Sequence, residues 1–174
     1  SLRELTVSVA FRREPRGILP TILATLLKRR KAAKQKQITV APFRGSAGVS
    51  QPEKEMVKGR KNKDFFLNFK AQSWWWLRLR FQATARAVAA AKEGKTDYKY
   101  DPEMVISLSS EIPDLSALTM ELSQPTYSIN TNGKLLVDKV PDGTMSPNLS
   151  DSVMMLCSPG KRPVNVSNEL LAQI

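Results

Sequence analysis

The chain has 174 residues, of which 41% are hydrophobic, so it can bury one core and its length favours a single domain. It contains no histidine and one cysteine, Cys157, which excludes disulfides, zinc fingers and histidine-based catalytic dyads or triads. Any chemistry must therefore rest on carboxylates, hydroxyls or lysines. Because the sequence has no run of about eighteen apolar residues and no signal-peptide pattern, we expect a cytoplasmic protein without membrane contact.

The net charge of +11 is unevenly distributed along the chain. Residues 1–100 hold 23 Lys or Arg against 7 Asp or Glu, a balance of +16, whereas residues 101–174 hold 4 against 9, a balance of −5. Such an imbalance favours a polyanionic partner, with nucleic acid as the first choice. Basic surfaces also serve solubility or the binding of acidic proteins, so charge alone leaves these alternatives open.

The N-terminal part of the chain has an α/β pattern. Alternating apolar residues from Leu5 to Phe11 suit a half-buried strand, and helical spacing from Ile18 to about Lys36 predicts an amphipathic helix. A β-branched run at residues 38–41 then predicts a strand. The basic end of the helix is either a solvated terminus or a DNA contact, and its candidate DNA-binding residues are Lys28, Arg29, Arg30 and Lys31.

The next segment, residues 51–63, is polar, strongly charged and without periodicity, which predicts an exposed loop. Its candidate DNA-binding residues are Arg60, Lys61 and Lys63.

A long helix is predicted from Asp64 to Gly94, because helix-forming residues continue throughout and glycine is a common terminator. Three consecutive tryptophans, Trp74 to Trp76, point in three directions on a helix. We therefore expect at least one in the core and another against a neighbouring strand or a partner, in preference to stacking on nucleic-acid bases.

The acidic half predicts short elements. Residues 104–108 suit a brief strand, a helix should run from Asp114 or Ser116 to about Leu122, and Asn132-Gly133 between two alternating runs predicts a hairpin over residues 126–137. A last helix should begin near Ser146-Pro147, with Asp151 in its first turn. Cys157 lies beside two methionines and a leucine, so we expect it to be a buried hydrophobic residue. Residues 160–174 are predicted to form a flexible tail.

Five blocks of the sequence, in order, resemble the C-terminal nuclease region of bacteriophage or prophage terminase large subunits. They cover roughly residues 34–159 and are Ile38–Gly45, Arg60–Phe66, Lys70–Trp75, Glu121–Tyr127 and Ser146–Asp151. The resemblance implies one domain over residues 1–159, with an RNase H-like α/β fold: a mixed sheet flanked by helices, with a β-hairpin. It also implies an endonuclease that cuts concatemeric viral DNA during capsid filling.

In that family, a cluster of acidic residues holds divalent ions, Mg²⁺ or Mn²⁺, which activate water and stabilise the leaving oxygen. Asp151 matches the last of these acids and is our candidate catalytic and metal-binding residue. Two earlier acids of the family have no match here. The family's acid before a Gly-rich turn falls within Val7–Gly17, which supplies no corresponding aspartate, and the acid on the family's first central strand is missing as well. We therefore expect a nuclease domain that is incomplete at its N-terminal side, and whether it acts as a hydrolase stays open.

Three hypotheses follow for the function. The chain is a metal-dependent nuclease region, a catalytically inert module that binds double-stranded DNA, or a piece that docks on the portal protein or the small terminase subunit through its tryptophan-rich helix. No ATPase phosphate-binding loop is present in the sequence.

Overall fold

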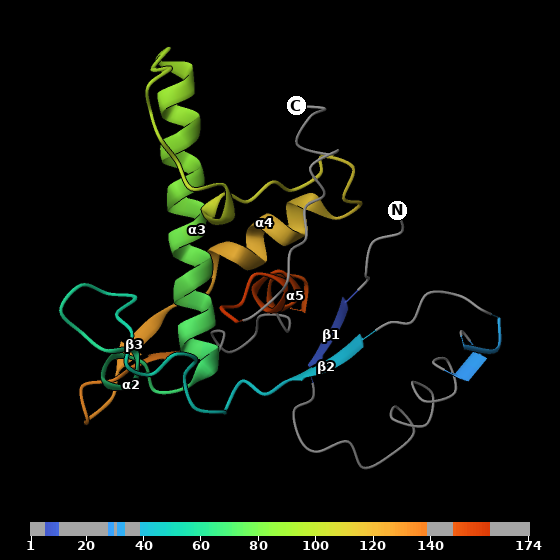
Figure 1. Cartoon of the computed structure of the whole chain (residues 1–174), viewed down its shortest axis with the longest axis vertical. Helices are drawn as coiled ribbons and strands as arrows, with labels where there is room; N and C mark the ends of the chain where they lie inside the picture. The colour runs from blue at the N-terminus through green and yellow to red at the C-terminus, as the bar shows by residue number, and fades with distance from the viewer. Residues whose placement is uncertain (1–5, 11–27, 30, 34–38, 139–147, 161–174) are drawn as a thin grey trace.

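The long helix α3 (Phe69–Lys92) is the element along which the others are arranged in the computed structural model (Figure 1). The structure describes residues 6–10, 28–29, 31–33, 39–138 and 148–160. The side chain of Asn68 caps the start of α3 by accepting a hydrogen bond from the Ala71 N–H at 2.9 Å. Gly94, with φ at +72°, ends the helical region as predicted.

The start of this region differs from the continuous helix predicted from Asp64. A four-residue helix, α2 (Asn62–Phe65), is followed by a break before α3 begins. In the break, Phe66 forms a parallel bridge with Leu135, and the Leu67 N–H donates to the Leu135 carbonyl at 2.8 Å. The backbone at these residues therefore pairs with a distant strand instead of continuing the helix.

Two small sheets provide the strands of the described residues. β1 (Thr6–Ala10) and β2 (Thr39–Phe43) are parallel, with Thr6 opposite Thr39, while β3 (Tyr127–Ile129) and β4 (Leu135–Val137) form the predicted antiparallel hairpin. The expected mixture of helices and strands is thus confirmed. The two strand pairs do not join into the single mixed sheet that we expected, because α3 and α5 (Asn148–Leu156) lie between them (Figure 1).

Two apolar clusters lie on α3. The first joins α3 to α5 and contains Trp74, Leu77, Met154, Met155 and Cys157. The second joins α2, α3 and the hairpin and contains Phe65, Phe66, Ala71 and Leu135. Trp75 meets the Tyr127 ring of β3 edge-on, with 5.8 Å between the ring centroids. Both predictions for the tryptophans are confirmed, since one is buried and another covers a neighbouring strand, and Cys157 is buried as expected.

The segment after α3 contains a short 3-10 helix, η1 (Pro102–Met104), in place of the predicted brief strand. Backbone groups that would have joined a sheet pair with α3 side chains instead. Arg80 donates to the Val105 carbonyl at 3.1 Å, and the Ile106 N–H donates to the Thr84 hydroxyl at 2.9 Å. Helix α4 (Leu115–Ser123) follows close to its predicted bounds.

Some predictions fall largely outside the described residues. The helix predicted over residues 18–36 is described only at 28–29 and 31–33, where the Ala33 N–H donates to the Arg29 carbonyl at 2.9 Å. The tail at 160–174 is described only at Gly160. Within the described ranges, none of the helices combines the length and the apolar character that a membrane span requires.

Candidate functional site

Asp151 lies in the first turn of α5, as predicted, and α5 is held by its apolar face. Met154 is 1% exposed and belongs to the same cluster as Trp74 of α3. Helix α5 also contacts α4 and β1. Packing on several elements therefore places the Asp151 carboxylate at a defined position near the parallel strands.

A cationic side chain, Lys70, lies beside Asp151. Its ammonium nitrogen is 3.9 Å from the Asp151 Oδ1 atom. Lys70 is the second residue of α3. The Lys70 N–H donates to the Gly45 carbonyl and the Phe69 N–H to the Ala47 carbonyl, both at 2.9 Å. The loop that follows β2 is thereby tied to the start of α3, which brings Lys70 to the end of the parallel strands.

The Asp151 Oδ1 atom is buried and has no hydrogen-bond partner in the described part of the chain. The 3.9 Å separation from Lys70 is too long for a hydrogen bond, although it permits charge attraction. An unsatisfied buried carboxylate oxygen costs free energy, which a cation or a donor would recover.

Glu121 of α4 is a second carboxylate near the start of α5, and the sequence did not single it out. Its Oε2 atom accepts a hydrogen bond from the Ser150 N–H at 3.0 Å. It thus caps one of the backbone donors at the helix start, where a negative charge is favourable. Glu121 and Ser150 are 29 residues apart, so no local sequence pattern indicates this contact.

Two further acids precede α5 in the sequence, and neither is a free carboxylate in the described residues. Asp138 accepts a hydrogen bond from the Ser128 hydroxyl at 2.6 Å, and Asp142 lies outside the described residues. Across the described ranges, no group of three or more acidic, histidine or cysteine side chains could hold a metal ion. Divalent ions need several oxygen ligands, so Asp151 fits one ligand position, while the described residues do not fit a complete two-ion centre.

The predicted DNA-binding residues near the N-terminus are exposed where the structure describes them. Lys28, Arg29 and Lys31 lie on a short helical stretch and face solvent, whereas Arg30 lies outside the described residues. Their contact with DNA stays a prediction.

The second predicted group, on the loop at residues 51–63, is ordered by contacts within the loop. Lys61 and Lys63 both bind the Glu53 carboxylate, at 2.8 and 2.7 Å. Hydrogen bonds from Lys61 and then Lys63 lower the pKa of Glu53 to about 2, and the same pairing raises the pKa of Lys61. Arg60 lies over the Phe65 ring, with 4.9 Å from its guanidinium carbon to the centroid. All three residues therefore have local partners, which the local sequence did not indicate.

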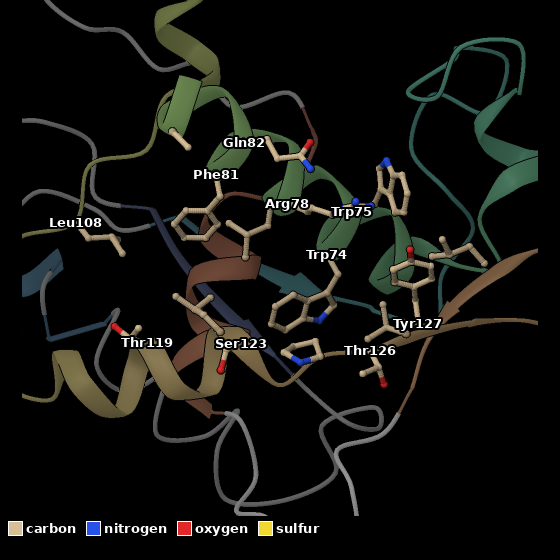
Figure 2. A pocket seen from close by; sticks show the side chains of 16 residues that line it. Trp74, Trp75, Arg78, Phe81, Gln82, Leu108, Thr119, Ser123, Thr126 and Tyr127 are labelled. Atoms are coloured by element: carbon tan, nitrogen blue, oxygen red, sulfur yellow. The ribbon is translucent and has the colours of Figure 1, made fainter. Parts of the chain in front are cut away.

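A groove of about 730 Å³ lies between α3, α4 and the hairpin, and Asp151 does not line it. Its walls are mostly apolar. Figure 2 shows Trp74, Trp75 and Phe81 of α3 on one side, and Thr119 and Ser123 of α4 on the other. At its edge, the Arg78 guanidinium lies 4.6 Å from the Trp75 ring centroid and 6.0 Å from that of Tyr127.

Comparison with known proteins gives a result only among solved structures. No family model matches the chain, and no curated protein matches it. The nuclease domain of the large terminase subunit gp2 of bacterial virus Sf6 is similar with a TM-score of 0.63 and 29% identity, over 79% of this chain and 61% of that domain. A lysine-to-alanine variant of that domain with manganese has a TM-score of 0.61 and 30% identity, over 79% of this chain and 62% of the variant.

A further structure of the variant, with calcium, also has a TM-score of 0.61 and 30% identity, over 79% of this chain and 61% of that one. The chain thus spans less than two thirds of the nuclease domains it matches. Fold and sequence agree across most of the chain. The resemblance inferred from the five sequence blocks is therefore confirmed: this chain matches the C-terminal nuclease region of a phage terminase large subunit.

Proposed function

We propose that this chain is part of the nuclease of a DNA-packaging motor, a metal-dependent endonuclease that cuts concatemeric viral DNA in the cytoplasm of the bacterial host. The observation that supports it is the match to the Sf6 nuclease domain in both fold and sequence, over 79% of the chain. An RNase H-like fold, and the portal protein and small terminase subunit as partners, belong to the same proposal.

Double-stranded DNA is the proposed substrate, because the charge of the chain is concentrated in one half. The balance of +16 in residues 1–100 includes exposed cations at Lys28, Arg29 and Lys31. Lysine and arginine side chains bind phosphates and release counterions, so DNA affinity should fall steeply as salt rises. Arg30, Arg60, Lys61 and Lys63 complete the proposed set of contacts.

Asp151 is the proposed metal ligand, with Mg²⁺ or Mn²⁺ as the ion. Its buried Oδ1 atom has no hydrogen-bond partner in the described residues, and a carboxylate oxygen is a ligand that both ions accept. Because the described residues do not fit a complete two-ion centre, we expect weak metal binding and little cleavage by this chain.

Two measurements test this function. DNA binding should be detected by fluorescence anisotropy at low salt and should weaken steeply along a salt series; absent or salt-independent binding would contradict it. Mn²⁺ titration calorimetry should show weak binding that Asp151→Asn reduces and the matched control Asp64→Asn, an exposed acid on α2, leaves unchanged. Equal binding by both variants would remove Asp151 from the metal site.

The groove beside Arg78 supports docking on a partner of the motor as a second candidate function. Arg78 has no hydrogen-bond acceptor within the described part of the chain, and two aromatic rings hold its guanidinium at the edge of an apolar groove. An apolar protein segment with one acidic side chain fits these features, since its carboxylate would pair with Arg78.

The docking candidate is tested with purified portal protein and purified small terminase subunit. Thr119→Arg places a large cation in the groove and should abolish binding, whereas Met120→Arg, on the exposed neighbour that does not line the groove, should preserve it. Binding that survives Thr119→Arg would exclude the groove as the docking site.

A further inference from the structure

Lys70 occupies a position that disfavours a cation. It is the second residue of a 24-residue helix whose first turn holds no acidic residue. The positive end of the helix dipole lies there, so a lysine in the first turn is destabilising unless an anion is close. The anion that the described residues supply is Asp151.

The backbone around Lys70 holds the base of its side chain in place. A Cβ atom added to Gly45 would lie 3.3 Å from the Lys70 Cβ atom and 3.4 Å from the Phe43 ring, so the loop after β2 packs directly on the lysine. Phe43 in turn packs on the Phe69 ring, with 5.3 Å between centroids. The stem of Lys70 is therefore fixed, while its side chain keeps 44% exposure for its flexible end.

Asp151 balances this positive charge only in part. The 3.9 Å distance leaves the Asp151 Oδ1 atom without a hydrogen bond and leaves the ammonium without one from Asp151. The starts of two helices, α3 and α5, also meet here through this pair, and each adds positive potential, of which Glu121 offsets part by accepting from the Ser150 N–H at the start of α5. The ammonium is thus loosely held at a place where a second anion would be stabilised.

We propose that Lys70 is a phosphate-binding residue of the DNA-cleavage site. In the absence of DNA its ammonium stays beside Asp151, and when duplex DNA binds it moves to a backbone phosphate next to that carboxylate. Lys70 thereby brings the phosphate to the candidate catalytic acid and offsets the repulsion between two negative groups. This inference rests on the DNA binding proposed above and is independent of metal binding by Asp151.

The test measures binding of a labelled duplex by anisotropy in EDTA, over a salt series, for Lys70→Gln, Asp151→Asn and the double variant. The matched control is Lys92→Gln, an exposed lysine of the same helix about 33 Å away along its axis. Lys70→Gln should weaken binding about threefold to tenfold and reduce the steepness of the log–log salt dependence by about 0.9, the value for one phosphate contact. Lys70→Arg should restore most of the affinity.

Asp151→Asn should strengthen DNA binding about twofold to fivefold, because it removes repulsion and releases Lys70. In the Lys70→Gln background this gain should shrink, which shows coupling between the two side chains. The inference is overturned if Lys70→Gln behaves like Lys92→Gln, or if the gain from Asp151→Asn is the same in both backgrounds. If the unaltered chain does not bind the duplex, the proposed DNA binding is contradicted together with this inference. If it binds and Lys70→Gln behaves like Lys92→Gln, this inference alone is overturned.

Discussion

In two places in this chain lysine side chains lie beside a carboxylate, and the two groups differ in how completely their charges are paired. On the loop at residues 51–63, Glu53 binds Lys61 and Lys63 at 2.8 and 2.7 Å, and all three side chains are well exposed. At the start of α5, Asp151 lies 3.9 Å from Lys70 and keeps a buried oxygen without a hydrogen bond. The first group satisfies its own charges, whereas the second leaves charge available for another molecule.

The difference arises from what positions each group. The loop cations reach Glu53 over short sequence distances, and flexible exposed side chains adjust until their hydrogen bonds are short. Lys70 and Asp151 are each fixed by the backbone and core of a different helix. A pair that the fold holds slightly apart keeps charge that its two members do not fully neutralise.

The largest expected effect comes from removing the packing that fixes the second group. Met154→Ala should lower the free energy of unfolding by about 2–5 kcal/mol, because Met154 is 1% exposed in the cluster with Trp74. Chemical denaturation followed by tryptophan fluorescence measures it. Met120→Ala, at a site that is 60% exposed, is the control and should change stability by less than about 0.5 kcal/mol. Equal effects of the two variants would show that α5 is not anchored by this cluster.

An intermediate effect is expected from Asn62, which orders the loop of the first group. Its side chain accepts from the Met56 N–H at 3.0 Å and donates to the Gln51 and Ser50 carbonyls at 2.9 and 3.3 Å. Asn62→Ala should lower the free energy of unfolding by about 1–3 kcal/mol, because it leaves partly buried backbone groups unpaired.

Hydrogen exchange separates this effect from a global one. Amide exchange should accelerate in residues 50–61 and stay unchanged in α5. Uniform acceleration over both regions would contradict the independence of the two groups. Asn132→Ala, on the exposed hairpin turn, is the control for loss of an asparagine amide.

The smallest effect is expected from releasing the loop lysines. Glu53→Gln should tighten DNA binding by about twofold to threefold at low salt, since Lys61 and Lys63 lose their carboxylate partner and become available to phosphates. Glu93→Gln, which releases Lys95 from a 2.7 Å pair at the far end of α3, is the control. No gain relative to this control would remove Lys61 and Lys63 from the DNA-binding set.

The Glu53 carboxylate also makes the stability of the chain depend on pH, and the direction of that dependence follows from its pKa. The pKa of Glu53 is lowered from 4.5 to about 2, so its contribution to stability is present above about pH 4.5 and is lost as pH falls towards 2. The difference in stability between the unaltered chain and Glu53→Gln should therefore be constant above that range and shrink below it. A difference that persists unchanged at pH 2 would show that the pairing with Lys61 and Lys63 does not cause it.

Several elements could be predicted from the sequence because their signals are local. The hairpin follows from Asn132-Gly133 between two alternating runs, and Gly133 indeed has φ at +73°. The end of α3 at Gly94 and the burial of one tryptophan follow from glycine conformation and helical geometry. The position of Asp151 in the first turn of α5 was also predicted, although its role came from the family resemblance.

Other features depend on contacts between distant segments. The break between α2 and α3 occurs because Leu67 pairs with Leu135, and residues 105–106 are not a strand because they bond to Arg80 and Thr84. No local pattern contains these partners. Propensity describes what a segment favours alone, and tertiary hydrogen bonds override it when they satisfy the same backbone groups.

The basic and acidic halves, the main helices and the hairpin can be predicted from the amino-acid sequence alone, because composition, periodicity and turn residues act over short distances. Which charges meet depends on the tertiary structure. It paired Glu53 with Lys61 and Lys63, placed Glu121 on the Ser150 N–H, and brought Lys70 beside Asp151. The last of these contacts arises because α5 packs its methionines on the Trp74 side of α3, and that packing sets the distance between charges that lie far apart in the chain.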